Sequence, residues 1–155
     1  MASLGEQELK RLGVPFTSHE YDYRIKGAEA ASGALGIPLS AALKTLVIRL
    51  ADERYVFLCV PGGSAVSMRN LARALHVKGA ELASERDAER LTGYRVGGIG
   101  PFGSRTPLPL YLDLGALDHA QVYINGGRRG LLLRLDPEQL VESGRAELID
   151  VGREG

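Results

Sequence analysis

The stretch from Gly97 to Gly103 constrains the fold of this chain more than any other segment. It reads Gly-Gly-Ile-Gly-Pro-Phe-Gly, and three of its glycines have the G-x-G-x-x-G spacing of a dinucleotide-binding loop. Such a loop must lead into a helix whose N-terminus holds a pyrophosphate. Pro101 lies inside the motif, and Pro107 and Pro109 follow where that helix would run. We therefore expect a stiff loop, either a structural turn or a binding loop, and no dinucleotide cofactor.

Composition narrows the class of protein. The 155 residues and the 45% hydrophobic content fit one domain, residues 1–155, with its own core. Lys and Arg together number 19, as do Asp and Glu, so contact with nucleic acid requires a local basic patch. The single cysteine, Cys59, excludes a disulfide framework, and with three scattered histidines it leaves no zinc site.

The N-terminal segment carries four charged residues among its apolar ones, at positions 6, 8, 10 and 11. It therefore matches neither a signal peptide nor a membrane span. We expect a cytoplasmic protein with no membrane association.

Caps and periodicity predict short helices and strands in irregular alternation. The expected helices cover residues 4–12, 26–35, 67–75, 85–92 and 137–143, and the expected strands cover 16–23, 43–50, 55–60, 77–82, 108–114, 121–125, 130–135 and 146–151. Several neighbouring strands are joined by tight turns, such as Asn125-Gly126-Gly127. The predicted fold class is α/β, a single domain with a mixed, mostly antiparallel curved sheet and short flanking helices.

Lys44 is the most informative charged residue, because it lies in a run of β-branched and aliphatic residues. Strand alternation places it on the same face as Leu46 and Ile48. Either Lys44 extends to solvent at the entrance of the strand, or its face opens into a pocket where a positive charge meets a phosphate.

Other candidates also have two interpretations. Tyr21 is typical of the edge of a core or of a ligand contact. Arg128 and Arg129 at a hairpin tip are either solvated or contact phosphate, and in the second case neutralising both would weaken nucleic-acid binding and its salt dependence. Nothing near Cys59 favours a reactive thiolate.

Three motifs resemble the YbaK/EbsC family of aminoacyl-tRNA deacylases, which includes free-standing YbaK and ProX proteins and the editing domain of many prolyl-tRNA synthetases. They are residues 43–46 (LKTL), 92–103 (TGYRVGGIGPFG) and 123–131 (YINGGRRGL), and the resemblance spans nearly the whole chain. It implies a YbaK-like fold and hydrolysis of the ester that joins a wrong amino acid to the 3′ end of a tRNA, commonly tRNA(Pro). A second site of this kind is needed because a prolyl pocket cannot strongly reject similar or smaller residues.

The resemblance also implies roles for residues. Lys44 would anchor the phosphate or sugar of the terminal adenosine, and the loop from Gly97 would hold the scissile carbonyl with backbone groups. Arg128 and Arg129 would contact the tRNA, and prolyl-tRNA synthetase is a possible partner. No metal ion or other cofactor is expected. The resemblance, which extends to Tyr21 near the N-terminus and to Leu132 on the return strand, implies substrate contacts from Tyr21, Thr45, Gly98, Ile99, Pro101, Phe102, Asn125, Gly126 and Leu132.

Two residues depart from the cysteine-specific YbaK proteins, which carry serine where this chain has Asn125 and aspartate where it has Leu132. The more apolar pocket favours alanine or another small residue, with cysteine still open. The nucleophile is either a thiol of the substrate or a positioned water assisted by a ribose hydroxyl. Asp113 and Asp118 are the nearest carboxylates in sequence, and neither is an obvious general base. The alternative function is a non-catalytic module that binds tRNA ends or a synthetase.

Overall fold

A computed structural model describes residues 1–23 and 28–152 of the chain. Its first helix, α1 (Leu4–Leu12), begins and ends at the predicted signals. The Ser3 hydroxyl accepts a hydrogen bond from the Glu6 N–H at 3.1 Å, and the Glu6 carboxylate accepts one from the Ser3 N–H at 2.8 Å. Gly13 ends the helix with φ of 76°. The strand β1 (Thr17–Glu20) follows and is shorter than expected.

The larger sheet is built on the hairpin of β2 (Leu43–Leu50) and β3 (Tyr55–Pro61), which pair antiparallel as predicted. The strand β4 (Ala80–Leu82) pairs antiparallel with the far end of β2. On the other side, β5 (Leu110–Asp113) runs parallel to β3, and β8 (Glu147–Ile149) runs parallel to β5. The strand order is β4-β2-β3-β5-β8.

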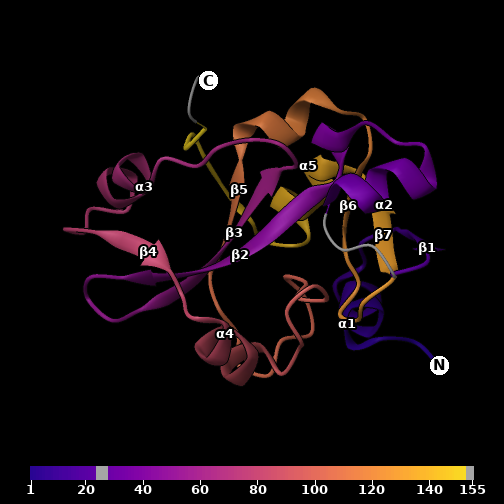
Figure 1. Ribbon diagram of the computed structural model, residues 1–155, viewed down its shortest axis with the longest axis horizontal. Coiled ribbons are helices and arrows are strands. Elements are labelled where there is room, and N and C mark those ends of the chain that lie inside the picture. The colour runs from indigo at the N-terminus through magenta and orange to yellow at the C-terminus, as the bar shows by residue number, and fades with distance from the viewer. Residues whose placement is uncertain (24–27, 153–155) are drawn as a thin grey trace.

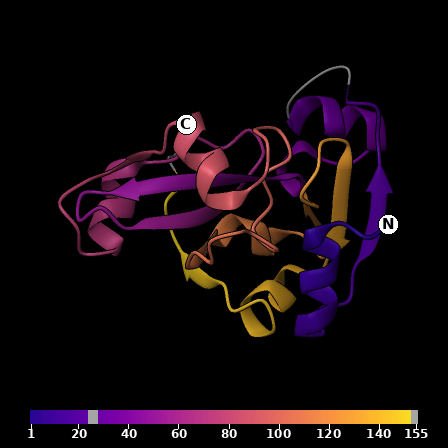
Figure 2. The ribbon, with the colours of Figure 1, turned by 90° about the horizontal axis from the view of Figure 1, so that it is seen from below.

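A smaller antiparallel sheet has the order β1-β7-β6, with β6 (Val122–Asn125) and β7 (Leu131–Leu135) joined by the predicted turn. Figure 2 shows β1 beside β7 at one end of the molecule, with the long β2–β3 hairpin running away from them. The two sheets meet at an isolated bridge between Ala42 and Tyr123. The prediction of a mixed, mostly antiparallel α/β fold is confirmed. The strands form two sheets, because the 3₁₀ segment Leu114–Asp118 redirects the chain between β5 and β6.

Short helices flank these sheets (Figure 1). They are α2 (Ala28–Leu35), the 3₁₀ segment Leu39–Ala41, α3 (Met68–Ala74), α4 (Glu85–Thr92) and α5 (Pro137–Glu142). The first two residues of the predicted helix 26–35 lie outside the described residues. The expected strand 77–82 begins only at Ala80, after His76 adopts φ of 57°. Within the described ranges, no helix has the length and hydropathy that a bilayer crossing requires.

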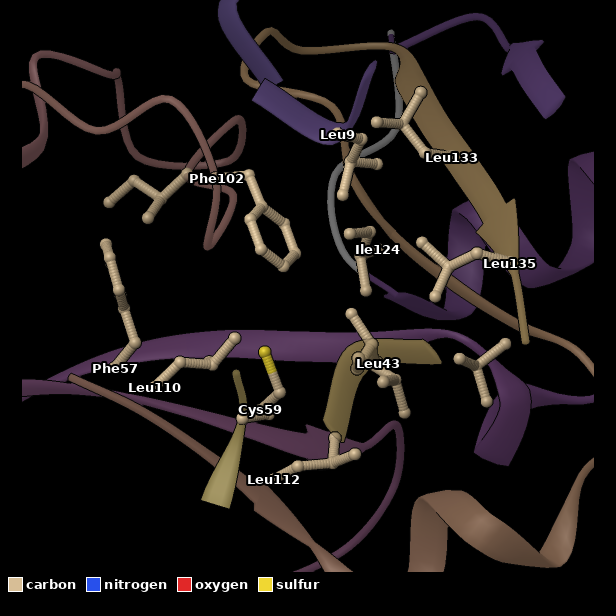
Figure 3. Packing of buried hydrophobic residues seen from close by; sticks show 14 of the residues in the cluster. Leu9, Leu43, Phe57, Cys59, Phe102, Leu110, Leu112, Ile124, Leu133 and Leu135 are labelled. Carbon is tan, nitrogen blue, oxygen red and sulfur yellow. The ribbon is translucent and has the colours of Figure 1, made fainter. Parts of the chain in front are cut away.

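Each face of β2 contributes to a different part of the core, as strand alternation requires. Figure 3 shows Ile124, Leu133 and Leu135 of the smaller sheet facing Leu43 and Cys59 of the larger one. The opposite face of β2 packs its Ile48 and Leu50 with Leu71 of α3 in a second cluster. Lys44 has the parity of this second face and lies at its open end, beside the smaller sheet.

Candidate functional site

The two sheets enclose a cavity of about 320 Å³ at their junction, which we call the junction pocket. It is lined by the start of β2, the end of β6, the middle of β7, the loop after α4 and the segment that follows β1. These segments lie far apart in sequence, and the fold brings them to one end of the larger sheet (Figure 1). Seven of the predicted site residues line this pocket: Tyr21, Lys44, Thr45, Gly97, Ile99, Asn125 and Leu132.

Lys44 enters the pocket from the second residue of β2. Its side chain is half-buried, and it makes no hydrogen bond or ion pair with the described part of the chain. The neighbouring Leu43 is buried in the core, which fixes the face on which Lys44 stands. A cation without a protein partner at the wall of a small cavity is available to an anionic ligand.

Asn125 and Leu132 form another wall, because they lie directly opposite each other in the β6–β7 ladder. Directly opposed residues share a face, so their side chains lie side by side. Leu132 is buried, whereas the Asn125 carboxamide has no hydrogen-bond partner among the described residues. Tyr21 follows β1 on this face, and desolvation is the main cause that raises the pKa of its hydroxyl. The wall is therefore apolar with one free amide.

The loop Gly97–Gly103 forms the third wall and is held by Tyr94. The buried Tyr94 hydroxyl donates to the Phe102 carbonyl at 2.7 Å, and burial raises the pKa of this hydroxyl to about 12. A Cβ atom on Gly127 would lie 3.0 Å from the Tyr94 ring, so the β6–β7 turn packs on the same side chain. Tyr94 thus supports both the loop and the turn.

Arg129 connects the turn to the loop from outside the pocket. Its Nε and a terminal guanidinium nitrogen donate to the Val96 carbonyl at 3.0 and 2.8 Å, and its guanidinium lies 5.4 Å from the centre of the Tyr23 ring. Gly97 follows with φ of 94°, and its N–H has no hydrogen-bond acceptor within the residues described. In a planar trans peptide the carbonyl and the next N–H point in opposite directions. Arg129 therefore fixes the direction of the Gly97 N–H.

The remaining predicted residues lie elsewhere. Gly98 and Gly126 are buried where the loop packs on the turn. A Cβ atom on Gly98 would lie 2.8 Å from the backbone nitrogen of Arg129. Pro101 and Phe102 line a separate, larger cavity of about 920 Å³ beside α1. Arg128 pairs with Glu20 at 2.8 Å on the surface. The structure does not bring these residues into the junction pocket.

Sequence reasoning missed other residues of the pocket wall. Tyr23, Leu46 and Val96 all line it. Tyr23 is two residues after Tyr21, so alternation predicts that both lie on the same face. Val96 immediately precedes the glycine loop. Both positions could therefore have been predicted from the sequence. Leu46 lies on the same face of β2 as Lys44. Strand alternation predicts this shared face, but it does not predict that an apolar residue there lines the pocket.

Groups considered for catalysis or metal binding lie outside the pocket. Cys59 is buried, and desolvation raises the pKa of its thiol to about 12. Asp113 is buried and accepts hydrogen bonds from the Gly115 and Val151 N–H groups, so it has a structural role. Among the residues that the structure describes, no cluster of three or more His, Cys, Asp or Glu side chains is arranged to hold a metal ion.

Comparison with known families gives this geometry a context. Residues 23–143 match the family described as "Aminoacyl-tRNA editing domain". The chain belongs to the aminoacyl-tRNA editing domain family. The match includes the Lys44 strand, the glycine loop and the β6–β7 turn, so it covers most of the junction pocket.

Individual relatives agree with this assignment. The chain is 28% identical over 140 residues to the Enterococcus faecalis protein named "Putative Cys-tRNA(Pro)/Cys-tRNA(Cys) deacylase EbsC", covering 89% of this chain and 85% of that one. It is 34% identical over 83 residues to a proline–tRNA ligase of Caldicellulosiruptor bescii, covering 54% of this chain and 14% of the ligase. A solved structure described as "a putative trans-editing enzyme for prolyl tRNA synthetase" superposes with a TM-score of 0.86 at 25% identity, covering 97% of this chain and 96% of that one.

Proposed function

We propose that this protein is a trans-editing deacylase that hydrolyses the ester of a mischarged tRNA, with tRNA(Pro) carrying alanine or cysteine as its substrate. The observation that carries the proposal is that Lys44 and the Gly97 N–H line one small pocket and that neither has a partner among the described residues. An ammonium group suits a phosphate or ribose of the terminal adenosine, and a free backbone N–H suits the acyl oxygen. Membership of the editing family supports this pairing.

The reaction follows from these two contacts. Lys44 holds the terminal nucleotide, so that the ester carbonyl lies against Gly97 and the amino acid side chain lies between Asn125 and Leu132. Water adds to the acyl carbon, and the Gly97 N–H stabilises the negative charge that develops on the carbonyl oxygen. The bond from the acyl carbon to the ribose oxygen then breaks, and this oxygen takes up the proton that the attacking water gives up, so that the products are the free tRNA hydroxyl and the amino acid. The contribution of Lys44 is positioning, which requires no proton transfer from it.

Pocket size and lining support a small amino acid as the group removed. The cavity of about 320 Å³ must also admit part of the terminal ribose, which limits the space for the side chain. Leu132 offers an apolar contact suited to a methyl or a thiol, and Asn125 offers a hydrogen bond to the amino acid. The relative named for Cys-tRNA(Pro) and Cys-tRNA(Cys) makes cysteine the competing substrate.

The proposed setting is the cytoplasm, in the company of prolyl-tRNA synthetase. This partner is suggested by the similarity to proline–tRNA ligases. A free-standing domain would act on mischarged tRNA after its release from the synthetase, or while both proteins hold it.

A panel of substrates tests the proposal. Hydrolysis is measured for alanyl-, cysteinyl-, seryl- and threonyl-tRNA(Pro), with Lys44→Ala as the inactive control and Lys10→Ala on α1 as the matched lysine control. We expect fast hydrolysis of alanyl- or cysteinyl-tRNA(Pro) that is lost in Lys44→Ala and retained in Lys10→Ala. Retained tRNA binding without hydrolysis of any substrate would instead support the non-catalytic module.

A further inference from the structure

A second cavity, remote from the junction pocket, is surrounded by cations. It is a hollow of about 430 Å³ between α3 and β4, and Arg69, Arg73 and Lys78 lie at its rim. Its floor is formed by apolar and small residues, including Met68 and Ala72. None of the described residues that line it is acidic. We call this feature the basic hollow.

The three cations of the basic hollow have no counterion among residues 1–23 and 28–152. Arg69, Arg73 and Lys78 are exposed and form no ion pair or side-chain hydrogen bond with any described residue. Arg69 and Arg73 are four residues apart on α3, a spacing at which like charges repel on a helix. An anion bound between the cations would offset their mutual electrostatic repulsion.

Nearby carboxylates are already engaged by a different arginine. Glu81 of β4 pairs with Arg49 at 3.2 Å, and Glu53 of the β2–β3 turn pairs with the same guanidinium at 3.3 Å. These two carboxylates therefore do not neutralise the basic hollow, whose cations pair with none of the residues that the structure describes. In a chain with equal numbers of acidic and basic residues, this is the kind of local patch that a polyanion requires.

The basic hollow lies on the same side of the larger sheet as Lys44. Residues of the Lys44 parity in β2 pack against α3, and Leu50 at the end of β2 pairs with Ala80 of β4. Six residues separate Lys44 from Leu50, which is about 20 Å along a strand. Figure 1 shows α3 and β4 at one end of the molecule and α2, near the junction pocket, at the other. About six phosphates of one strand of a nucleic acid helix span this distance.

We propose that the basic hollow binds backbone phosphates of the acceptor stem of a tRNA whose aminoacylated 3′ end occupies the junction pocket. This inference rests on the proposed function. With the single-stranded 3′ end stacked on the stem as a continuation of its strand, a contact about six nucleotides from the terminal adenosine falls in the paired part of the stem. Such a contact carries no sequence information, but it orients the stem on the protein.

The test compares wild type with the triple variant Arg69→Gln, Arg73→Gln and Lys78→Gln. Binding of uncharged tRNA is measured by fluorescence anisotropy from 50 to 300 mM salt, so the result does not depend on catalysis. The slope of log K against log salt is negative, and each lost phosphate contact reduces its magnitude by about 0.7 to 0.9. Because the triple variant removes three cations, we expect the magnitude of its slope to be smaller than that of wild type by about 2. An unchanged slope would overturn the proposal.

Two further arms separate the explanations. A control variant removes three cations elsewhere on the surface: Lys10→Gln, Arg86→Gln and Arg90→Gln. It should keep the wild-type salt slope. An equal reduction of the slope in this control would show that only net charge matters and would overturn the proposal. Hydrolysis of an aminoacylated CCA trinucleotide should be the same in wild type and the triple variant, while hydrolysis of full-length aminoacyl-tRNA falls. Equal loss on both substrates would also refute the stem contact.

The same arms distinguish failure of this proposal from failure of the proposed function. If wild type hydrolyses neither substrate, the deacylase assignment fails, while the binding slope still decides the role of the basic hollow. Inorganic phosphate provides the last arm. Saturable phosphate binding that the triple variant loses, with no change in the tRNA slope, would assign the hollow to a small anion and contradict the stem contact.

Discussion

Replacement of Arg129 by alanine is expected to reduce catalysis more than it reduces binding. The substitution removes the two hydrogen bonds to the Val96 carbonyl and the contact with the Tyr23 ring. The Gly97 N–H remains but is no longer held in one direction. Since complete loss of an oxyanion donor costs about 100- to 1000-fold in kcat, loss of its support should cost about 10- to 100-fold.

The stability cost of Arg129→Ala should be modest, because the side chain is exposed. Charged hydrogen bonds contribute about 1.5 to 3 kcal/mol when well shielded, and exposed cation–π contacts about 0.5 to 1 kcal/mol. With exposure discounted, we expect about 1 to 2 kcal/mol in total, which lowers Tm by about 3 to 6 °C for a chain of this size. The variant therefore folds and can be assayed.

Steady-state hydrolysis of the best substrate in the panel separates this role from a phosphate contact. Arg129→Ala should lower kcat with little change in KM or in the salt dependence of binding, and added guanidinium ion should partly restore kcat. Arg128→Ala is the matched control, because Arg128 lies in the same turn and pairs with Glu20 on the surface. The reasoning is refuted if Arg129→Ala keeps kcat within about twofold of wild type, or if both variants raise KM equally.

Three further outcomes are expected. Glu6 accepts hydrogen bonds from Ser18 and Ser3, which lower the pKa of its carboxyl from 4.5. The stability that Glu6 contributes is therefore present above pH 4.5 and is lost as the pH falls through the lower pKa of the folded state. Glu6→Gln should reduce the loss of Tm below pH 4.5. Cys59 should resist alkylation by iodoacetamide at pH 8 in the folded protein, because a pKa of about 12 leaves about one thiol in 10,000 ionised; rapid labelling before unfolding would contradict its burial. Replacing Leu132 by aspartate should reduce hydrolysis of alanyl-tRNA(Pro) about tenfold or more relative to cysteinyl-tRNA(Pro), because a carboxylate replaces the apolar contact; an unchanged ratio, measured by competition, would remove Leu132 from the specificity wall.

Local signals in the sequence predicted most of the elements. The Ser3 and Ser84 caps and the stops at Gly13 and Gly93 place the ends of α1 and α4 where the structure has them. Alternation in β2 also predicted the face of Lys44. These features depend on neighbours a few residues away, so periodicity and cap chemistry are sufficient to locate them.

The assembly of the pocket was harder to predict. Pro101 and Phe102 belong to the same motif as Gly97, yet they line a different cavity, where the Tyr94 hydroxyl holds the Phe102 carbonyl. The hydrogen bonds from Arg129 to the Val96 carbonyl form only because the β6–β7 turn lies close to the glycine loop. Such contacts join segments about 30 residues apart and leave no periodic trace in the sequence. Division of the strands into two sheets was missed for the same reason.

The double support given by Tyr94 has a consequence for how the pocket moves. Its hydroxyl holds the loop at Phe102 while its ring fills the space beneath Gly127 in the turn, so neither wall can open without disturbing a buried side chain. The two walls should therefore form one cooperative unit in native-state hydrogen exchange. Substrate would then meet a preorganised cleft, and differences in selectivity would arise from side chains exchanged on rigid walls.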